Sequence, residues 1–261
     1  MQCIFHELLQ AFRNLACRWL WAVLVLLLAS VLPPAMASAQ TVEIEPDSAF
    51  FQRGTELYLQ HCFSCHGPSG DGQGPIAEFF VPRPPDFKVG NFKFVTSDLG
   101  EYPTRDDVIR AIDHGGLSGT EIGIPSFKDI ETLDRIAISE AVRVFAEIPE
   151  YADPFLVPPQ PASAKIEAGK ALYSEHGCID CHGPKGDGNG ILSPDLVDSR
   201  GYKVMPANLT LGRFKGGNAS NDVWMRIYAG ISGTPMPSFG RSLSVQDIWS
   251  LVSFVESFRA E

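Results

Sequence analysis

The sequence has few cysteines and few basic residues. Of its six cysteines, only four lie beyond residue 17, and all four belong to two short motifs. No cysteine is left over for a disulfide framework. Lysines and arginines number 21 against 31 aspartates and glutamates, which gives a net charge of −10. Such an acidic protein repels nucleic acid and suits a protein partner with a basic docking face.

The sequence also lacks an apolar run of membrane-spanning length near its start. The run from Trp19 to Leu32 has 14 residues, fewer than the roughly 20 that cross a bilayer. Pro33-Pro34 and the small-residue pattern Ala37-Ser38-Ala39 follow it. These features predict a signal peptide at residues 1–39 and export to the periplasm. An uncleaved segment that anchors the protein to a membrane is the alternative.

Two copies of one pentapeptide contain the remaining cysteines. They are Cys62-Phe63-Ser64-Cys65-His66 and Cys178-Ile179-Asp180-Cys181-His182. Cys-x-x-Cys-His is the attachment sequence of a c-type haem: each thiol joins the macrocycle, and the histidine becomes an axial ligand of the iron. A zinc half-site is the alternative, but neither half of the chain has a second cysteine pair to complete it. The motifs therefore predict two covalently bound haems c, with His66 and His182 as iron ligands.

The sequence around the two motifs is repeated. The matched segments are Gly67–Gly72 with Gly183–Gly188, Asp86-Phe87 with Asn208-Leu209, Phe92-Lys93 with Phe214-Lys215, and Pro125-Ser126-Phe127 with Pro237-Ser238-Phe239. Such self-similarity indicates a duplicated domain. We predict a first domain at residues 40–148, a proline-rich linker at 149–162 that acts as a semi-rigid spacer, and a second domain at 163–261.

Each copy begins and ends with a helical pattern. Asp47 and Ser163 are the expected N-caps of the first helices, which contain Gly54 and Gly169. Because a glycine inside a helix costs about 1 kcal/mol relative to alanine, its recurrence indicates that another helix crosses close by. The expected partner is the last helix of each copy. Its apolar stripe is Ile138, Ala141, Val142 and Phe145 in the first copy, and Ile248, Leu251, Val252 and Val255 in the second, where Ser244 and Asp247 form a capping-box pattern.

These features together resemble class I cytochrome c: a helix leading into Cys-x-x-Cys-His, a glycine-rich loop, a late Met-Pro and a closing amphipathic helix. The duplication resembles the tandem dihaem cytochromes c of bacterial respiratory chains. The resemblance covers residues 47–258 and is weakest from Phe79 to Thr104. It implies an all-α fold of two tandem class I cytochrome c domains. It also implies single-electron transfer between respiratory redox partners, as a carrier or as the cytochrome subunit of an oxidoreductase complex, which would allow membrane association.

Met236 is the expected sixth ligand of the second haem. Its thioether sulfur is a soft ligand that raises the potential of a haem iron, and Pro235 and Pro237 restrict the backbone on both sides. Met225 lies in a helical pattern typical of a core residue, and Met205 lies in a loop. For the proximal histidines, a proline carbonyl at Pro75 or Pro194 is the expected partner of the second ring nitrogen.

The first haem requires a different sixth ligand. Ile124 occupies the position of Met236, and no methionine occurs between Gln40 and Val204. His114 is the candidate, since its counterpart in the second copy is Ala229. The alternative ligands are Lys88, Lys93 and Lys128. An open site is the other possibility; it would favour an enzyme acting on peroxide, nitrogen oxides or sulfur compounds. No catalytic acid–base cluster is evident around this haem, which favours electron transfer without catalysis.

Overall fold

The computed structural model describes residues 48–115 and 125–260, so the predicted signal peptide, Asp47 and Ile124 lie outside the described residues. Within these ranges the chain is helical and contains no strand, apart from an isolated bridge between Val197 and Lys203. The predicted all-α fold is confirmed. None of the described helices combines the length and the apolar character needed to cross a bilayer. Residues 48–115 and 125–260 belong to one compact unit.

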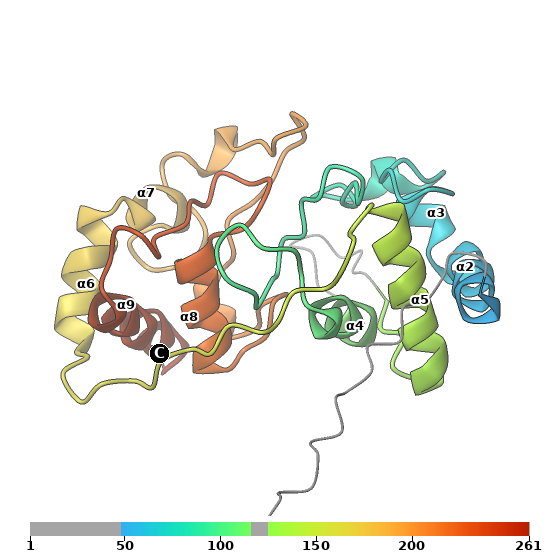
Figure 1. Cartoon of the computed structure of the whole chain (residues 1–261). Coiled ribbons are helices and arrows are strands. Elements are labelled where there is room, and N and C mark those ends of the chain that lie inside the picture. Colours follow the sequence, from blue (N-terminus) through green and yellow to red (C-terminus); the bar gives the residue numbers. More distant parts are fainter. Residues whose placement is uncertain (1–47, 116–124, 261) are drawn as a thin grey trace, which may run out of the picture. The chain divides into compact units, whose positions relative to one another are not determined.

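The helices follow one another in the same order in the two copies (Figure 1). The first copy contains α2 (Ala49–His61), α3 (Phe63–His66), η1 (Ala77–Phe79), α4 (Arg105–His114) and α5 (Thr132–Phe145). The second contains α6 (Ile166–Glu175), α7 (Cys178–His182), η2 (Ser193–Asp195), η3 (Leu209–Leu211), α8 (Ser220–Ala229), α9 (Val245–Ser257) and η4 (Phe258–Ala260). Thus α2 corresponds to α6, α3 to α7, α4 to α8 and α5 to α9. The short helices α3 and α7 are the Cys-x-x-Cys-His motifs themselves.

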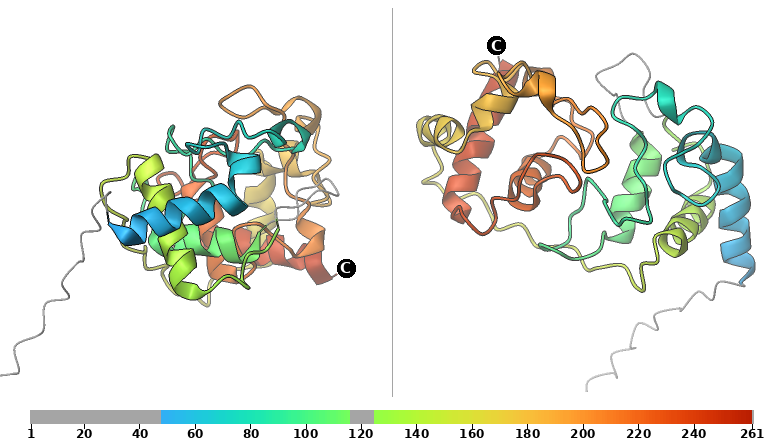
Figure 2. Two further views of the ribbon diagram at one scale, coloured as in Figure 1. Left: turned by 90° about the vertical axis from the view of Figure 1, so that its right-hand side faces the viewer. Right: turned by 90° about the horizontal axis from the view of Figure 1, so that it is seen from above.

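A glycine lies where the first and last helices of each copy cross. A Cβ atom added to Gly54 of α2 would lie 2.0 Å from the carbonyl oxygen of Ala137 in α5. A Cβ atom added to Gly169 of α6 would lie 2.0 Å from the carbonyl oxygen of Ser250 in α9. The predicted close crossing is therefore confirmed in both copies, and α2 lies beside α5 in the views (Figure 1, Figure 2).

The closing helix of the second copy is capped and buried as its sequence predicts. Ser244 is the N-cap of α9, and its side chain accepts a hydrogen bond from the backbone N–H of Asp247 in a capping box. The predicted stripe of α9 is buried, and it packs with Trp224 and Met225 of α8. Met225 is a core residue, 1% exposed, as expected. In α5 the corresponding stripe is also buried, except that Phe145 is half-buried.

Both predicted N-caps are wrong: Ser48, not Asp47, caps α2, and Ser163 does not cap α6. Helix α6 begins at Ile166 after Lys165, and no side chain caps it. Ser163 lies too far upstream, and its hydroxyl instead donates to Oε1 of Gln246 in α9 at 3.0 Å. In the first copy Ser48 caps α2, because its hydroxyl accepts from the N–H of Phe51 at 3.1 Å. The Ser163 hydroxyl, which the sequence pattern assigned to the start of α6, therefore binds α9 instead.

The proline-rich linker has no helix from residue 151 to residue 160, but it is bound along its length. Tyr151 donates its phenolic hydrogen to the carbonyl of Ser139 at 2.6 Å. The N–H of Phe155 donates to the carbonyl of Thr96 at 2.7 Å. Farther along, Nε1 of Trp249 donates to the carbonyl of Pro158 at 2.9 Å. The linker is therefore packed against both copies and is not a free spacer, while the predicted domain boundaries stay a prediction.

The loop with the weakest family resemblance, residues 79–104, bonds to the second copy. Asn91 donates to the hydroxyl of Ser199 at 3.1 Å, and Asp98 accepts from the hydroxyl of Tyr228 at 2.8 Å. The carbonyl of Val95 accepts from the Arg226 guanidinium. These contacts give a physical reason for the loop's divergent sequence, since it serves the contact between the copies.

Candidate haem centres

The motif helices place both thiols of each pair together. Cys62 ends α2 and precedes α3, and Cys178 begins α7. Because residues three apart lie on the same side of a helix, Cys62 and Cys65 face one direction, as do Cys178 and Cys181. All four thiols are free and half-buried. Both pairs are therefore available for attachment to one macrocycle each.

The protein environment keeps the motif thiols protonated at neutral pH. Burial, with a smaller contribution from Cys65, raises the pKa of the Cys62 thiol to about 12. Burial also raises the pKa of Cys178 to about 11. In the described ranges no group of three or more histidine, cysteine, aspartate or glutamate side chains is placed to hold a metal ion.

The proximal histidines are held with one ring nitrogen on the protein side. Nδ1 of His182 lies 3.1 Å from the carbonyl oxygen of Ala207. Burial lowers the pKa of His182, and this carbonyl offsets part of the shift. A neutral imidazole with Nδ1 engaged leaves Nε2 to ligate iron. A His182 that donates from Nδ1 to this carbonyl would present Nε2 to iron, and its ligation stays a prediction.

The corresponding group in the first copy is His66. Burial lowers its pKa to about 4, and the carbonyl of Pro85 partly opposes this shift. Its buried Nδ1 has no hydrogen-bond partner among the described residues. The Phe87 ring stacks on the imidazole with the ring centroids 4.8 Å apart, and Phe92 stacks in turn on Phe87 at 5.8 Å. Both copies therefore fit an axial histidine.

The predicted carbonyl partners of the histidines, Pro75 and Pro194, are wrong. Pro85 and Ala207, which occupy matching positions in the repeat, face the rings instead. In each copy, the backbone N–H two residues after this carbonyl closes the loop. Phe87 donates its N–H to the carbonyl of Gly70 at 2.7 Å, and Leu209 donates to that of Gly186 at 2.6 Å. This bond turns the preceding carbonyl toward the imidazole.

The glycine-rich loop after each motif is tied to the motif by identical hydrogen bonds. Gly72 donates its N–H to the carbonyl of His66, and Gly188 donates to that of His182, both at 2.9 Å. These glycines have positive φ values of 71° and 81°, which a side chain would oppose. The loops therefore fix the backbone of the axial histidines.

A buried tyrosine repeats the same support from the first helix. Tyr58 of α2 donates to the carbonyl of Gly67 at 2.9 Å, and Tyr173 of α6 donates to that of Gly183 at 2.8 Å. Each bond reaches the residue directly after the axial histidine. The spacing to the motif is visible in the sequence, but the hydroxyl's target was not predictable because it depends on how the loop folds back.

The loop that contains Met236 is ordered by its own hydrogen bonds. The carbonyl of Met236 accepts from the N–H of Ile231 at 3.2 Å, and its N–H donates to the hydroxyl of Thr234 at 3.3 Å. Met236 is half-buried, whereas Met225 is in the core and Met205 is 54% exposed. This arrangement favours Met236 among the methionines, and its ligation of the second iron stays a prediction.

The ligand of the first haem also stays a prediction. His114 ends α4, is exposed, and has Nδ1 3.1 Å from the carbonyl oxygen of Arg110. That contact leaves Nε2 free. Of the lysine alternatives, Lys88 and Lys128 are exposed and Lys93 is half-buried. The loop that carries Ile124, on which the comparison with Met236 rests, lies outside the described residues.

The histidines that precede the motifs pack on repeated aromatic rings. His61 meets Phe127 edge to face with ring centroids 5.8 Å apart, and His176 meets Phe239 in the same way at 6.1 Å. Phe127 and Phe239 are matching positions of the repeat. Each histidine that precedes a motif therefore packs on the matching aromatic ring of its own copy.

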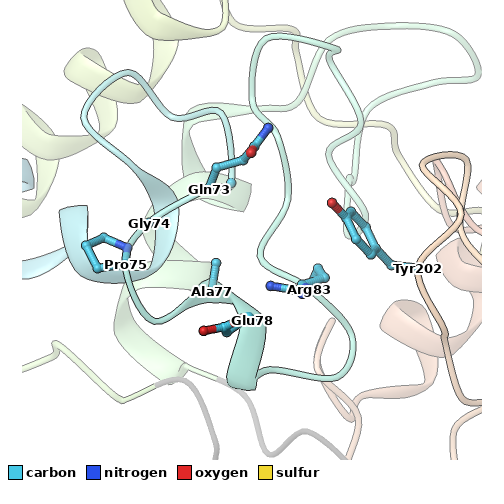
Figure 3. A pocket seen from close by; sticks show the side chains of 8 residues that line it. Gln73, Gly74, Pro75, Ala77, Glu78, Arg83 and Tyr202 are labelled. Atoms are coloured by element: carbon cyan, nitrogen blue, oxygen red, sulfur yellow. The ribbon is translucent and has the colours of Figure 1, made fainter.

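A small cavity of about 190 Å³ lies beside the loop of the first motif (Figure 3). The lining residues are Gly72, Gln73, Gly74, Pro75, Ala77, Glu78, Arg83 and Tyr202. The Arg83 guanidinium lies 5.0 Å from the centroid of the Tyr202 ring. Ligand pockets generally have volumes of about 300–1,000 Å³, so we assign no substrate to this cavity.

Comparisons with known proteins agree with this architecture. The family described as "Cytochrome c" matches residues 166–259, and the family described as "Cytochrome C oxidase, cbb3-type, subunit III" matches residues 49–143. Among solved structures, a chain of the reducing HAO-like protein complex of Kuenenia stuttgartiensis is 33% identical, with a TM-score of 0.73. The match covers 83% of this chain and 99% of that chain. A comparison with curated proteins found no match.

The helical fold and the two repeated Cys-x-x-Cys-His centres define a c-type cytochrome, a class whose cofactor performs electron transfer. The chain belongs to the tandem dihaem c-type cytochromes, as the family matches and the similar structure show. It carries two covalently bound haems c, one in each copy of the domain.

Proposed function

We propose that this chain is the electron-transfer subunit of an exported redox complex. The observation that carries the proposal is the similarity to a chain of the reducing HAO-like protein complex, at 33% identity over 99% of that chain's length. A match of nearly the whole neighbour supports a subunit more than a free carrier. The features of residues 1–39 support export to the periplasm, and service in a respiratory chain is part of the same proposal.

The charge of the chain supports a protein partner. With 31 acidic and 21 basic residues, it would attract a basic docking face and steer the encounter electrostatically. Such attraction weakens as salt is added, because the charges are screened. The partner is therefore a redox protein with a positively charged surface near its own cofactor.

The different ligand sets would give the electron a direction. The haem supplies a one-electron change at iron. His182 and Met236 offer the second iron one imidazole and one thioether, and the thioether favours the reduced state. No methionine occurs between Gln40 and Val204, so the first copy offers none. Its haem would then have the lower potential, so electrons enter at the first haem and leave from the second.

Copurification tests the proposal. The full-length chain, tagged at its C-terminus, is produced in its native organism and purified from periplasmic and membrane fractions at low and high salt. We expect a haem-containing partner in fixed stoichiometry at low salt, and its loss as the salt is raised. A chain that is monomeric in every fraction would contradict the subunit assignment. Turnover of peroxide, nitrogen oxides or sulfur compounds by the isolated chain would support an enzyme instead.

Two matched variants test the electron path. Cys62→Ala with Cys65→Ala removes the first haem, and Cys178→Ala with Cys181→Ala removes the second. In the reconstituted complex, we expect either pair to stop electron flow from donor to acceptor while the partner still copurifies. Undiminished flow after removal of the first haem would contradict the proposed path.

A further inference from the structure

Arg226 of α8 is a buried cation that forms no ion pair within 4.0 Å among the described residues, although Asp107 and Asp222 are near enough to oppose the lowering of its pKa. Its side chain is 8% exposed, and the guanidinium lies 5.6 Å from the centroid of the Phe94 ring. Nη2 donates to the carbonyl of Val95, but Nε and Nη1 are buried with no acceptor among the described residues. Burial lowers the pKa of Arg226 to about 10. Leaving a charged donor buried and unpaired is costly, so this site calls for an acceptor.

Two lysines at matching positions of the repeat adjoin Arg226 in the chain's packing. A Cβ atom added to Gly216, which follows Lys215, would lie 2.5 Å from Nη1 of Arg226 and 2.9 Å from the ring of Phe94, which follows Lys93. Burial lowers the pKa of Lys215 to about 8, and the charge of Lys93 lowers it further. Burial also lowers the pKa of Lys93, with Asp198 opposing and Arg200 adding to the shift. In the described ranges neither ammonium group forms an ion pair within 4.0 Å. Like charges repel, so their proximity also requires a counter-charge.

The nearby carboxylates are already engaged. Asp107 accepts from the backbone N–H of Thr104 and pairs with Arg110. Asp222 accepts from the N–H of Ala219 in the cap of α8 and lies 3.4 Å from Arg110. Asp198 accepts from the N–H groups of Arg200 and Tyr202, both at 2.9 Å. Asp107 and Asp222 stabilise the starts of α4 and α8, and Asp198 stabilises a turn. Among the described residues, no carboxylate is therefore left to pair only with the lysines and Arg226.

The sequence connects the two lysines to the haem sites. In the first copy, Phe92 precedes Lys93 and stacks on Phe87, which stacks on the axial histidine His66. In the second copy, Lys215 follows Phe214, six residues beyond Leu209, whose N–H bonds the loop of the second motif. Each lysine therefore belongs to the segment that closes around its own proximal histidine.

A haem carries two propionate carboxylates, and covalent attachment fixes where they lie. We propose that Lys93, Lys215 and Arg226 form one basic site, shared by the two copies, that binds propionate carboxylates of both haems. Carboxylates are the natural acceptors for guanidinium and ammonium donors. Because both lysines belong to one site, the two haems are electrostatically coupled through it. The proposal goes beyond electron transfer itself, because it names residues that set the reduction potentials of the two haems.

The test is a redox titration of the haem-loaded full-length protein, monitored by its visible spectrum. We expect Lys215→Met to lower the potential of the second haem by a tenfold change in the reduction equilibrium, about 59 mV for one electron. The potential of the first haem should fall as well, by a smaller amount. Lys93→Met should give the reverse ranking. Lys170→Met, which changes an exposed lysine of α6, is the control and should move neither potential.

A second readout separates carboxylate binding from a simple charge effect. Resonance Raman spectra contain a propionate bending band that responds to hydrogen bonding. We expect this band to shift in Lys93→Met, Lys215→Met and Arg226→Gln, and to return in Lys215→Arg. Arg213→Gln, an exposed neighbour in the same loop, is the control. If Arg226→Gln does not fold, the two lysine variants decide the matter by themselves.

Two results would overturn the proposal. One is a propionate band and two potentials that stay at their unmutated values in both lysine variants. The other is a shift in the reduction potentials of the unmutated protein when inorganic phosphate is added at constant ionic strength. That result would show that the cations bind a free anion and not the carboxylates of the haems.

Discussion

Replacing Gly169 by alanine tests the helix crossing that organises each copy. Helix propensity alone predicts a gain of about 1 kcal/mol, because alanine favours the helical backbone over glycine. The structure predicts a loss. The new Cβ would lie 2.0 Å from the carbonyl oxygen of Ser250, 2.6 Å from its carbonyl carbon and 2.8 Å from Cβ of Phe254. No rotamer change relieves contacts of this kind, since they involve backbone atoms and a Cβ atom.

The magnitude follows from the forced separation of α6 and α9. Overpacking a tight contact costs about 1–3 kcal/mol, and a backbone obstacle places Gly169→Ala at the upper end. After subtraction of the propensity gain, we expect the free energy of unfolding to fall by about 2 kcal/mol. Burial of the α9 stripe would suffer, because α6 could no longer approach it. Gly54→Ala should behave alike, through the carbonyl of Ala137.

Urea unfolding of the haem-loaded protein, followed by far-ultraviolet circular dichroism, measures the change. The matched control is Ala171→Gly, at an exposed position of α6, which should lose only the propensity difference of about 1 kcal/mol. The reasoning fails if Gly169→Ala stabilises the protein, since that is the result for a helix with open space beside residue 169.

Three further outcomes concern the haems. Mass spectrometry of the denatured protein should show two haem additions, and Cys178→Ala with Cys181→Ala should lose one; an intact protein with a single haem would contradict the assignment. Met236→Ala should abolish the near-infrared sulfur-to-iron band of the oxidised protein and lower one potential, because imidazole or water favours the oxidised iron more than thioether does. A surviving band would point to another methionine. His114→Ala should remove the low-spin electron paramagnetic resonance signal of the first haem, and an unchanged signal, or a high-spin haem that binds carbon monoxide in the unmutated protein, would exclude His114 as the ligand.

Local patterns predicted much of the fold. The α9 stripe and the cap at Ser244 were predictable because both depend on residues three or four positions apart in one helix. Ser163 shows the limit of such patterns. Its hydroxyl could cap α6 by type and approximate position, but Gln246 of another helix binds it instead. The prediction of the carbonyl partner of His182 failed for the same reason, because the carbonyl of Ala207 reaches the imidazole only when the loop closes.

The sequence by itself determined the class of protein and the number of haems. Covalent attachment requires two thiols and a histidine at fixed short spacing, and nothing distant in the chain can alter that chemistry. Only the tertiary structure decided which groups of the two copies meet. Arg226 and the carbonyl of Val95 are 131 residues apart in the chain, and Lys93 and Lys215 belong to different copies. Their proximity follows from the packing of the copies against each other, a property that no periodicity within either copy contains.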